Sequence, residues 1–509
     1  MSEQQANYRQ VLKATSLFGG VQFINVIISI IRTKFIAVLI GPAGMGIAGL
    51  LSSTTMLIGG ITNFGLGISA VKDISAAHVT NDQKRIALIL TVFRWLVWIT
   101  GILGTLITLI FSPLISNITF GNRNYTLAFI WISITLLFGQ LSSGQLAVLQ
   151  GMRKLRDLAN ASVLGSFLGL AVTLPLYYFY GIDGIVPAII LTSIASLLIS
   201  WYFGRKVKTE TIKVTRKIMF AEGKSMLIIG SVISVNGILA LVTSYVMRIY
   251  INSRGGIADV GLYNAGFAIV NSYVGMIFTA MLTDYYPKLS SVVNDTKLFN
   301  QTINQQADIA LLLIAPIISI FLVFIQIGVT VLLSTKFLAV EGMLIWAMLG
   351  VFFKTASWPI GFIFIPKGDS KLFFFSELAG NIYTFIFNIA GYYYWGLEGL
   401  GISFLIGYLI YYLQVSTIAR LKYHFSFEPA FYRIFIVQFS LAVICFIIEK
   451  YLSIPYLKYP IGLLLIGISI WHSIKELNKR LNIKTLMASV KMKYGISFNS
   501  NDKRSDKTD

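Results

Sequence analysis

Two arginines lie in stretches of sequence that are otherwise as apolar as hydrocarbon. Arg32 falls within "FINVIISIIRTKFIAVLIG" and Arg248 within "ILALVTSYVMRIY". A cation inside a membrane span is costly and by default marks a functional site, whereas a cation near a helix end extends to the interface. The planar guanidinium group donates to phosphate oxygens in a bidentate way. If both arginines face one cleft without a carboxylate, that cleft would bind an anion such as a lipid phosphate or pyrophosphate headgroup.

Further polar side chains recur at helical spacing along the apolar segments. Residues three and four apart share one face of a helix, and polar stripes in lipid must face other helices or water. Hydrogen bonding between helices explains any single stripe as well as a cavity does, but the set favours a polar central cavity. The substrate-binding candidates beside the two arginines are Gln22, Asn25, Ser29, Asn381 and Asn388, with Lys354 as a third cation or an interfacial packing residue.

Lys34 lies only two residues beyond Arg32, so it points about 200° away around the helix. Both cations cannot face one cavity, and we expect Lys34 to be an interfacial or inter-helix cation. Three carboxylates near the expected cytoplasmic ends of spans are candidates for coupling transport to a proton or sodium ion, or are simply solvated at the interface. They are Asp284, Asp308 and Glu377.

The sequence offers no constellation for catalysis or for a resident cofactor or metal. Cys445 is the single cysteine, which excludes an internal disulfide and argues against a cysteine-based metal site. "AEGKS" (221–225) mimics the end of a phosphate-binding loop, but Ile218 stands where that motif needs glycine. The expected outward loops are too short for a folded catalytic domain. We therefore expect a protein that is not an enzyme.

The elements that position these residues follow from composition. Of the 509 residues, 56% are hydrophobic and 12% charged, and continuous apolar runs long enough to cross a bilayer recur from end to end. The runs do not alternate in polarity as barrel strands do. The sequence predicts an all-α polytopic membrane protein with about fourteen transmembrane helices, arranged as two pseudo-symmetric six-helix lobes plus two C-terminal helices.

A weak internal repeat supports the two lobes. "RTKFIAVLIGPAGMGIAGL" from Arg32 and "RIYINSRGGIADVGLYNAG" from Arg248 both place an arginine before a glycine-containing connector and a glycine-rich helix start. Glycines at these connectors are hinge candidates: Gly41, Gly44, Gly46, Gly255 and Gly256. The expected organisation is an N-lobe over 1–204, a basic cytoplasmic linker over 205–224, a C-lobe over 225–420, two further helices within 421–475 and a basic cytoplasmic tail over 476–509.

The distribution of lysine and arginine predicts the orientation in the membrane. With both termini inside, cytoplasmic segments hold 31 of the 41 basic residues and outside segments hold five. Basic loops at a membrane surface explain the net charge of +20 without a nucleic-acid partner. The start "MSEQQANYRQ" lacks the pattern of a removable signal peptide.

Two stretches resemble a known family. "LFGGVQFINVIISIIRTKFIAVLIGPAGMGIAGL" and "DVGLYNAGFAIVNSYV…YYPKLS" are similar to the Wzx-type O-antigen flippases, the polysaccharide-transport branch of the multidrug/oligosaccharidyl-lipid/polysaccharide flippase superfamily. The resemblance implies translocation of undecaprenyl-pyrophosphate-linked oligosaccharide to the outer leaflet of the bacterial inner membrane, for lipopolysaccharide or related polysaccharide biosynthesis. It also implies contact with membrane lipids and, as a possible partner, a polysaccharide polymerase.

The resemblance extends to one residue and leaves two rivals open. Related lipid II flippases carry an arginine nine residues before a glycine-containing turn, as Arg32 and Gly41 are spaced here, which implies pyrophosphate binding by Arg32. The second span departs from them, having the neutral "ITNFGLGISAVK" in place of an arginine pair. The alternatives are a multidrug or cation-coupled exporter of the same fold and a membrane glycan polymerase. Coupling to the membrane potential, H⁺ or Na⁺ stays open.

Overall fold

The computed structural model describes residues 3–80, 82–207, 212, 214–271, 275–452 and 454–481, and within them all side chains except those of 3–19, 276, 280, 283, 284 and 481. The first half of the chain forms α1 (Glu3–Thr62), α2 (Leu66–Val79), α3 (Gln83–Ile110), α4 (Ser112–Phe120), α5 (Thr126–Gly151), α6 (Leu155–Tyr180) and α7 (Ile185–Gly204). The second half forms α8 (Arg216–Ile269), α9 (Gly275–Ser291), α10 (Thr296–Val323), α11 (Ile325–Leu332), α12 (Glu341–Gly361), α13 (Ser370–Tyr423), α14 (Pro429–Tyr451) and α15 (Pro455–Leu481).

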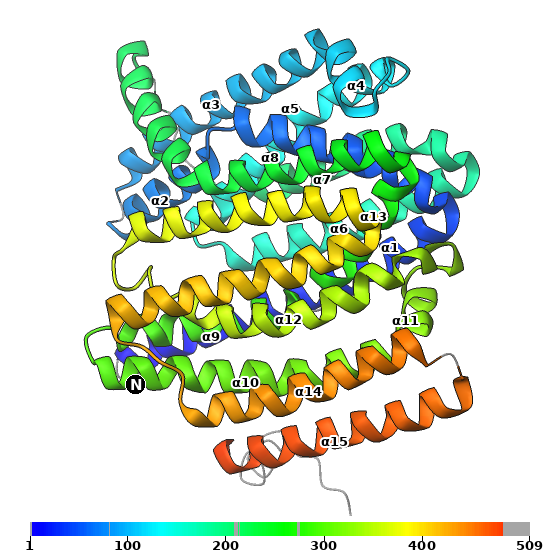
Figure 1. Cartoon of the computed structure of the whole chain (residues 1–509). Coiled ribbons are helices and arrows are strands. Elements are labelled where there is room, and N and C mark those ends of the chain that lie inside the picture. The colour runs from blue at the N-terminus through cyan, green and yellow to red at the C-terminus, as the bar shows by residue number, and fades with distance from the viewer. Residues whose placement is uncertain are drawn as a thin grey trace, which may run out of the picture.

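The helices lie side by side in one bundle (Figure 1). The N-terminal end of α1 lies at one end of the bundle, and the short helices α4 and α11 lie at the other. Local sequence explains where several helices begin. The Asp82 carboxylate accepts a hydrogen bond from the Arg85 amide at the start of α3, and Asp295 does the same for Leu298 at the start of α10. Pro429 is the first residue of α14, where its missing N–H costs nothing.

Among the described residues, ten helical stretches are long and apolar enough to cross a membrane, and no strand is present. The chain is therefore a multi-pass α-helical membrane protein, as predicted. Four of these stretches are 43 to 54 residues long, which is about twice the length needed for one crossing. Counting each of the four as two crossings would give the predicted fourteen, and this number stays a prediction.

Four glycines mark the turns within the long helical segments, and their spacing repeats. Gly41, Gly256 and Gly396 lie inside α1, α8 and α13, and Gly181 lies between α6 and α7; each has a φ between 54° and 83°. Only glycine adopts this left-handed region without strain. Gly41 and Gly181 are 140 residues apart, as are Gly256 and Gly396. The equal spacing is the internal symmetry expected of two related halves, while the predicted domain boundaries stay predictions.

The two halves meet where α1 crosses α8, close to their turn glycines. A Cβ atom added to Gly46 would lie 2.0 Å from the backbone oxygen of Ile257, and one added to Gly261 would lie 1.8 Å from the backbone oxygen of Pro42. The two helices therefore approach backbone to backbone, which only small residues permit. This contact closes the bundle between the halves at the end that carries Gly41 and Gly256.

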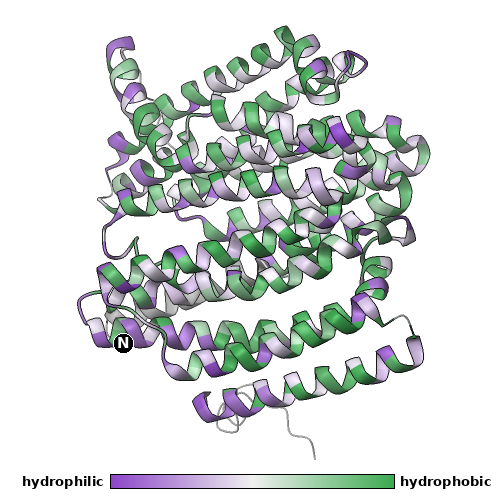
Figure 2. Ribbon diagram, viewed as in Figure 1, coloured by the Kyte–Doolittle hydropathy of each residue, from purple (hydrophilic) through white to green (hydrophobic). Residues whose placement is uncertain are grey.

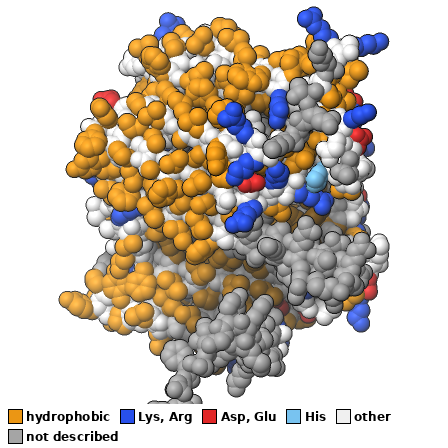
Figure 3. Space-filling model, turned by 180° about the vertical axis from the view of Figure 1, so that it is seen from behind, with side chains coloured by type: hydrophobic (Ala, Val, Ile, Leu, Met, Phe, Trp, Pro, Cys, Tyr) orange, Lys and Arg blue, Asp and Glu red, His pale blue; other side chains and the backbone are white. Residues whose placement is uncertain are grey.

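The outer surface suits hydrocarbon. Hydrophobic residues extend along the length of the helices, and hydrophilic residues concentrate toward the helix ends (Figure 2). Seen from behind, most of the described surface is hydrophobic, with lysine and arginine side chains gathered toward one edge (Figure 3). Many large apolar side chains are exposed, such as Trp131, Tyr202 and Trp471. Such a surface would aggregate in water and is stable in lipid.

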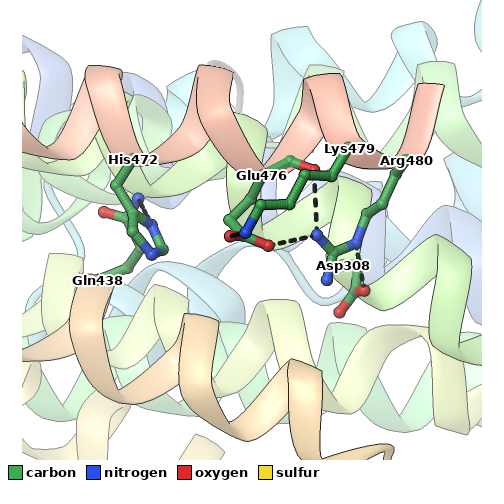
Figure 4. A network of polar contacts seen from close by, with 6 residues as sticks. All are labelled: Asp308, Gln438, His472, Glu476, Lys479 and Arg480. Atoms are coloured by element: carbon green, nitrogen blue, oxygen red, sulfur yellow. Dashed lines mark hydrogen bonds and ion pairs between the residues drawn. The ribbon is translucent and has the colours of Figure 1, made fainter. Parts of the chain in front are cut away.

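A polar network fastens α15 to the neighbouring helices (Figure 4). Arg480 Nε donates to Asp308 Oδ2 at 2.8 Å, and its Nη1 donates to Glu476 Oε2 at 2.6 Å. Further along α15, the Gln438 amide of α14 donates to the Ser469 carbonyl oxygen at 3.1 Å. The Asp308 side chain is only 12% exposed. Asp308, a candidate for ion coupling, thus has a structural partner, and its coupling role stays a prediction.

The glycine contact between the halves predicts a stability difference. Gly261→Ala should destabilise the protein by roughly 1–3 kcal/mol, because the added methyl group collides with rigid backbone. Gly467→Ala is the matched control, since a Cβ at this exposed helical glycine meets nothing within 4 Å. Thermal unfolding of the purified protein in detergent measures both. Equal unfolding temperatures for the two variants would contradict the close approach.

The Asp308–Arg480 ion pair predicts a non-additive double variant. Arg480→Gln should cost roughly 3–5 kcal/mol of stability, because it leaves a mostly buried carboxylate without its cation. Asp308→Asn combined with Arg480→Gln should recover a large part of that loss, since no unpaired charge remains. The measurement is a double-mutant cycle on unfolding temperature. Strictly additive effects of the two substitutions would show that the pair contributes nothing.

Candidate functional site

The two sequence-predicted arginines line the same cavity. This cavity, called here the arginine cavity, has a volume of about 500 Å³ and lies between α1 and α8, with Tyr177 of α6 and Ile189 of α7 completing its wall. Arg32 enters from the part of α1 before its turn, and Arg248 enters from the corresponding part of α8. The described residues that line it include no aspartate or glutamate. The cavity is therefore cationic.

Hydrogen bonds hold Arg248 in place without neutralising it. Its Nε donates to Asn264 Oδ1 at 2.8 Å, and its Nη1 donates to the Ser244 carbonyl oxygen at 2.9 Å and to the Ser244 hydroxyl. All three acceptors are uncharged. Among the described ion pairs, none includes Arg32 or Arg248. The positive charge of the cavity thus remains available to an anion.

Two buried donors in the cavity wall lack an acceptor among the described residues. They are Nε of Arg32 and Nδ2 of Asn264. The Asn264 amide lies against Gly49 of α1, where a Cβ would be only 2.0 Å away. A buried donor without an acceptor costs about 1–3 kcal/mol. Native structures tolerate such a cost chiefly where a ligand or water supplies the missing acceptor.

The polar stripe predicted on α1 also faces a cavity. Gln22, Asn25 and Ser29 line a space of about 310 Å³ together with Asn271, Gly275 and Thr279. Asn271 lines the arginine cavity as well, so the two spaces adjoin. Asn25 has a packing role in addition, because its Nδ2 donates to the Ser162 hydroxyl of α6 at 2.9 Å. The stripe therefore extends the polar space from the arginines toward the N-terminal end of α1.

The structure places Lys354 away from the arginines. A third cavity of about 390 Å³, between α12 and α13, is lined by Lys354, Glu377 and Asn381 together with Tyr408 and Tyr411. The Tyr411 hydroxyl donates to Glu377 Oε1 at 2.5 Å, and Lys354 Nζ lies 5.3 Å from the centre of the Tyr408 ring. Lys354 is thus not a third cation of the arginine cavity. Its cavity instead holds one cation and one carboxylate.

The remaining candidates fall into separate groups. Asn388 lies on α13 and lines none of the cavities described in this article. The Asp284 side chain lies outside the described residues. Lys34 Nζ donates to the Thr330 carbonyl oxygen of α11 at 2.8 Å, which agrees with an inter-helix cation. Among the described residues, no three His, Cys, Asp or Glu side chains gather where they could hold a metal ion.

The hinge candidates differ in what they do. Gly41 and Gly256 adopt positive φ at the turns. Gly44, Gly46 and Gly255 instead allow close packing, since added Cβ atoms would lie within 3 Å of Ile40, Ile257 and Tyr392 respectively. Their motion during transport stays a prediction.

Sequence reasoning did not select the aromatic part of the arginine cavity. Tyr177 and Tyr263 both line it, and the Tyr263 ring centre lies 5.7 Å from the Arg248 guanidinium carbon. Asn264 and Asn271 are seven residues apart, a spacing that puts both on one face of a helix, and Tyr263 directly precedes Asn264. This polar spacing was the signal that could have pointed to Tyr263. Tyr177 has no such signal, because only tertiary packing brings α6 to this wall.

Comparison with solved structures identifies the class of transporter fold. The chain matches the lipid II flippase MurJ in an inward closed conformation with a TM-score of 0.72, over 91% of this chain and 99% of that one, at 15% identity. It matches an inward-facing multidrug resistance transporter of the MATE family with a TM-score of 0.65, over 82% of this chain and 96% of that one, at 16% identity. At these identities the likeness shows the fold, which flippases and multidrug transporters share.

Sequence comparison then gives the family. The profile of the polysaccharide biosynthesis protein family matches residues 35–341, and the chain belongs to this family. It is 21% identical over 398 residues to the lipid III flippase of Escherichia coli (strain K12), a match that covers 74% of this chain and 91% of the relative. It is also 22% identical over 192 residues to stage V sporulation protein B of Bacillus subtilis (strain 168), covering 37% of each. Membership of the polysaccharide biosynthesis family agrees with the predicted resemblance, and the Wzx-type polysaccharide-transport branch stays a prediction.

The arginine cavity predicts a measurable affinity for pyrophosphate. Inorganic pyrophosphate at 100 times its dissociation constant should stabilise the wild-type protein by about 2.7 kcal/mol, seen as a higher unfolding temperature in detergent. Arg32→Ala and Arg248→Ala should lose this shift. Lys34→Ala is the control, because Lys34 is a nearby cation whose ammonium group contacts α11. An undiminished shift in either arginine variant would show that the anion binds elsewhere.

Proposed function

We propose that this protein is a flippase that moves an undecaprenyl-pyrophosphate-linked oligosaccharide from the cytoplasmic to the periplasmic leaflet of the bacterial inner membrane. The observation that carries the proposal is the arginine cavity, in which Arg32 and Arg248 from the two halves meet without a carboxylate among the described residues. A relative supports the same function, since a protein 21% identical to this chain over 398 residues is named a lipid III flippase. More specifically, we propose that the oligosaccharide is the repeat unit of O-antigen or a related surface polysaccharide.

The chemistry of the cavity matches a pyrophosphate headgroup. The Arg32 guanidinium group can form paired hydrogen bonds to phosphate oxygens, whereas Arg248, whose Nε and Nη1 donate to Asn264 and Ser244, contributes its charge and its Nη2. The buried Arg32 Nε and Asn264 Nδ2 still need acceptors. The polyprenyl tail stays in the acyl chains, so only the headgroup and its glycan enter the protein. The neutral stripe of Gln22, Asn25 and Ser29 offers hydrogen bonds to sugar hydroxyls next to the charged site.

Alternating access supplies the transport step. The backbone contact of Gly46 and Gly261 closes the halves near the turn glycines, which the lysine and arginine distribution assigns to the periplasmic side. The polar space continues in the other direction, along the α1 stripe, which supports an inward-facing arrangement as part of the proposal. Rocking of the proposed lobes, 1–204 and 225–420, would then expose the arginines outward.

The membrane potential offers a driving force. Moving a headgroup with about two negative charges outward across an inside-negative membrane releases about 2.3 kcal/mol per charge per 100 mV. Counter-transport of H⁺ or Na⁺ is the other route. Of the two candidates with described side chains, Glu377 is favoured over Asp308, because its carboxylate lines a cavity and accepts a hydrogen bond from the Tyr411 hydroxyl, whereas Asp308 is paired with Arg480. A multidrug exporter is the less favoured reading, since two arginines repel the amphipathic cations that such proteins carry.

The proposal predicts the effect of charge at two positions. In cells that lack their own flippase, Arg32→Ala and Arg248→Ala should each reduce surface polysaccharide at least tenfold, because a lost charge-assisted hydrogen bond costs about 1.5–3 kcal/mol. Arg32→Lys and Arg248→Lys should retain part of the activity, since lysine keeps the charge but not the bidentate geometry. Arg94→Ala, at an exposed arginine on α3, is the control.

Two outcomes would decide against this function. Full activity in both alanine variants would remove the pyrophosphate anchor. Drug resistance conferred by the wild-type chain, without rescue of surface polysaccharide, would favour the exporter instead.

A further inference from the structure

A fourth cavity adjoins the arginine cavity and has different chemistry. We call it the amide pocket; its volume is about 450 Å³, and it lies between the part of α1 after Gly41 and the middle of α5. Its described lining contains no charged residue. Its polar lining residues are Thr55, Asn63, Thr135, Gln140 and Ser143. A pocket of this size is within the range of about 300–1,000 Å³ that is usual for small-molecule sites.

The two cavities share part of their walls. Met56 of α1 and Leu241 of α8 line both. Met56 is 60% exposed, and both side chains are long and can change rotamer without moving the backbone. A molecule anchored at Arg32 and Arg248 can therefore extend into the amide pocket past two flexible apolar side chains.

Hydrogen-bonding capacity in the amide pocket is only partly used. Gln140 Nε2 donates to the Thr100 hydroxyl at 2.9 Å, which fixes the amide and leaves its Oε1 as an acceptor. Asn63 Oδ1 accepts from the Gly65 amide at 2.7 Å, which leaves Nδ2 as a donor. The Ser143 hydroxyl is exposed. Fixed neutral donors and acceptors in the pocket lining suit sugar hydroxyl groups, which both donate and accept.

We propose that the amide pocket binds an uncharged sugar residue of the lipid-linked glycan while the pyrophosphate lies at Arg32 and Arg248. The proposal rests on the proposed function and adds the site and the chemical class of the sugar. An ionised sugar placed here would lose hydration without gaining a partner of opposite charge. A neutral sugar exchanges water for amide and hydroxyl groups at little cost.

A glycine in the wall of the amide pocket allows a direct test of the proposal. Gly139 lies on α5 in the pocket wall, and a Cβ added there meets nothing within 4 Å. Gly139→Leu should therefore fold normally while its side chain fills the space proposed for the sugar. Ser143→Leu, one turn along the same face of α5, is a second and independent way to fill it. Gly467→Leu is the matched control, at an exposed helical glycine of α15 with equally open surroundings.

The experiment measures equilibrium binding by the purified full-length protein in nanodiscs. The probes are undecaprenyl pyrophosphate and the same lipid bearing a disaccharide of N-acetylglucosamine. We expect wild type and Gly467→Leu to bind the glycosylated probe about tenfold more tightly than the bare one. Gly139→Leu and Ser143→Leu should lose this preference and keep the wild-type affinity for the bare lipid.

The outcomes separate the pocket from the transport function. A preference that persists in both filled variants, or a wild-type protein that binds the two probes equally, would overturn the amide pocket as a sugar site. Failure of wild type to bind either probe would instead overturn the pyrophosphate anchor on which the proposed function depends. Arg32→Ala should weaken both probes to the same degree, because it removes the anchor and leaves the sugar site in place.

Discussion

The rest of the structure depends on two guanidinium groups placed in an apolar bundle without a counter-ion. The surrounding bundle is apolar, so the charges of Arg32 and Arg248 are screened less than they would be in bulk water, and the uncharged acceptors Ser244 and Asn264 only orient the Arg248 guanidinium group. A carboxylate in the same cavity would have satisfied the charge permanently. Because the described lining has no such carboxylate, a bound anion has to neutralise the charge of the two arginines. A transport site requires this property, since its cargo must both bind and leave.

Glycine contacts bring the two arginines together. Each arginine precedes a turn glycine by eight or nine residues, so related sequences place both at similar depths in the bundle. The backbone approach at Gly46 and Gly261 then holds α1 and α8 close together, and the arginine cavity lies between the same two helices. Small residues thus have two roles, reversing the chain at the turns and holding the halves close without side-chain interlocking. A contact made by backbone and small side chains is also one that helices can leave and re-form as the halves move.

Helical periodicity predicts which face of a helix is polar. It identified residues that line a cavity where the face of a single helix was enough to identify them. The stripe of Gln22, Asn25 and Ser29 lines a cavity, and the repeat placed Arg32 and Arg248 together. Periodicity does not tell which other helix a face meets. Lys354 was therefore grouped with the arginines, although it lines a different cavity, together with Glu377 of α13. The pairing of Asp308 with Arg480, 172 residues apart, has no local signal either. Thr55 and Gly59 of the amide pocket do share one face of α1 at helical spacing, but periodicity alone does not show that this face meets α5.

The arginine cavity is charged and the adjoining amide pocket is not, and this separation explains how one fold can carry different cargos. The fold alone does not determine the cargo, since a solved structure named a lipid II flippase and one named a multidrug resistance transporter share it. Pyrophosphate would be common to every undecaprenyl-pyrophosphate-linked glycan, and a cationic anchor for it therefore gives affinity without selecting among their sugars. Selection has to come from groups beyond the anchor, where each hydrogen bond contributes little and geometry matters more. An uncharged pocket beside the arginines, with its amides fixed by Thr100 and Gly65, provides that geometry without competing for the phosphate.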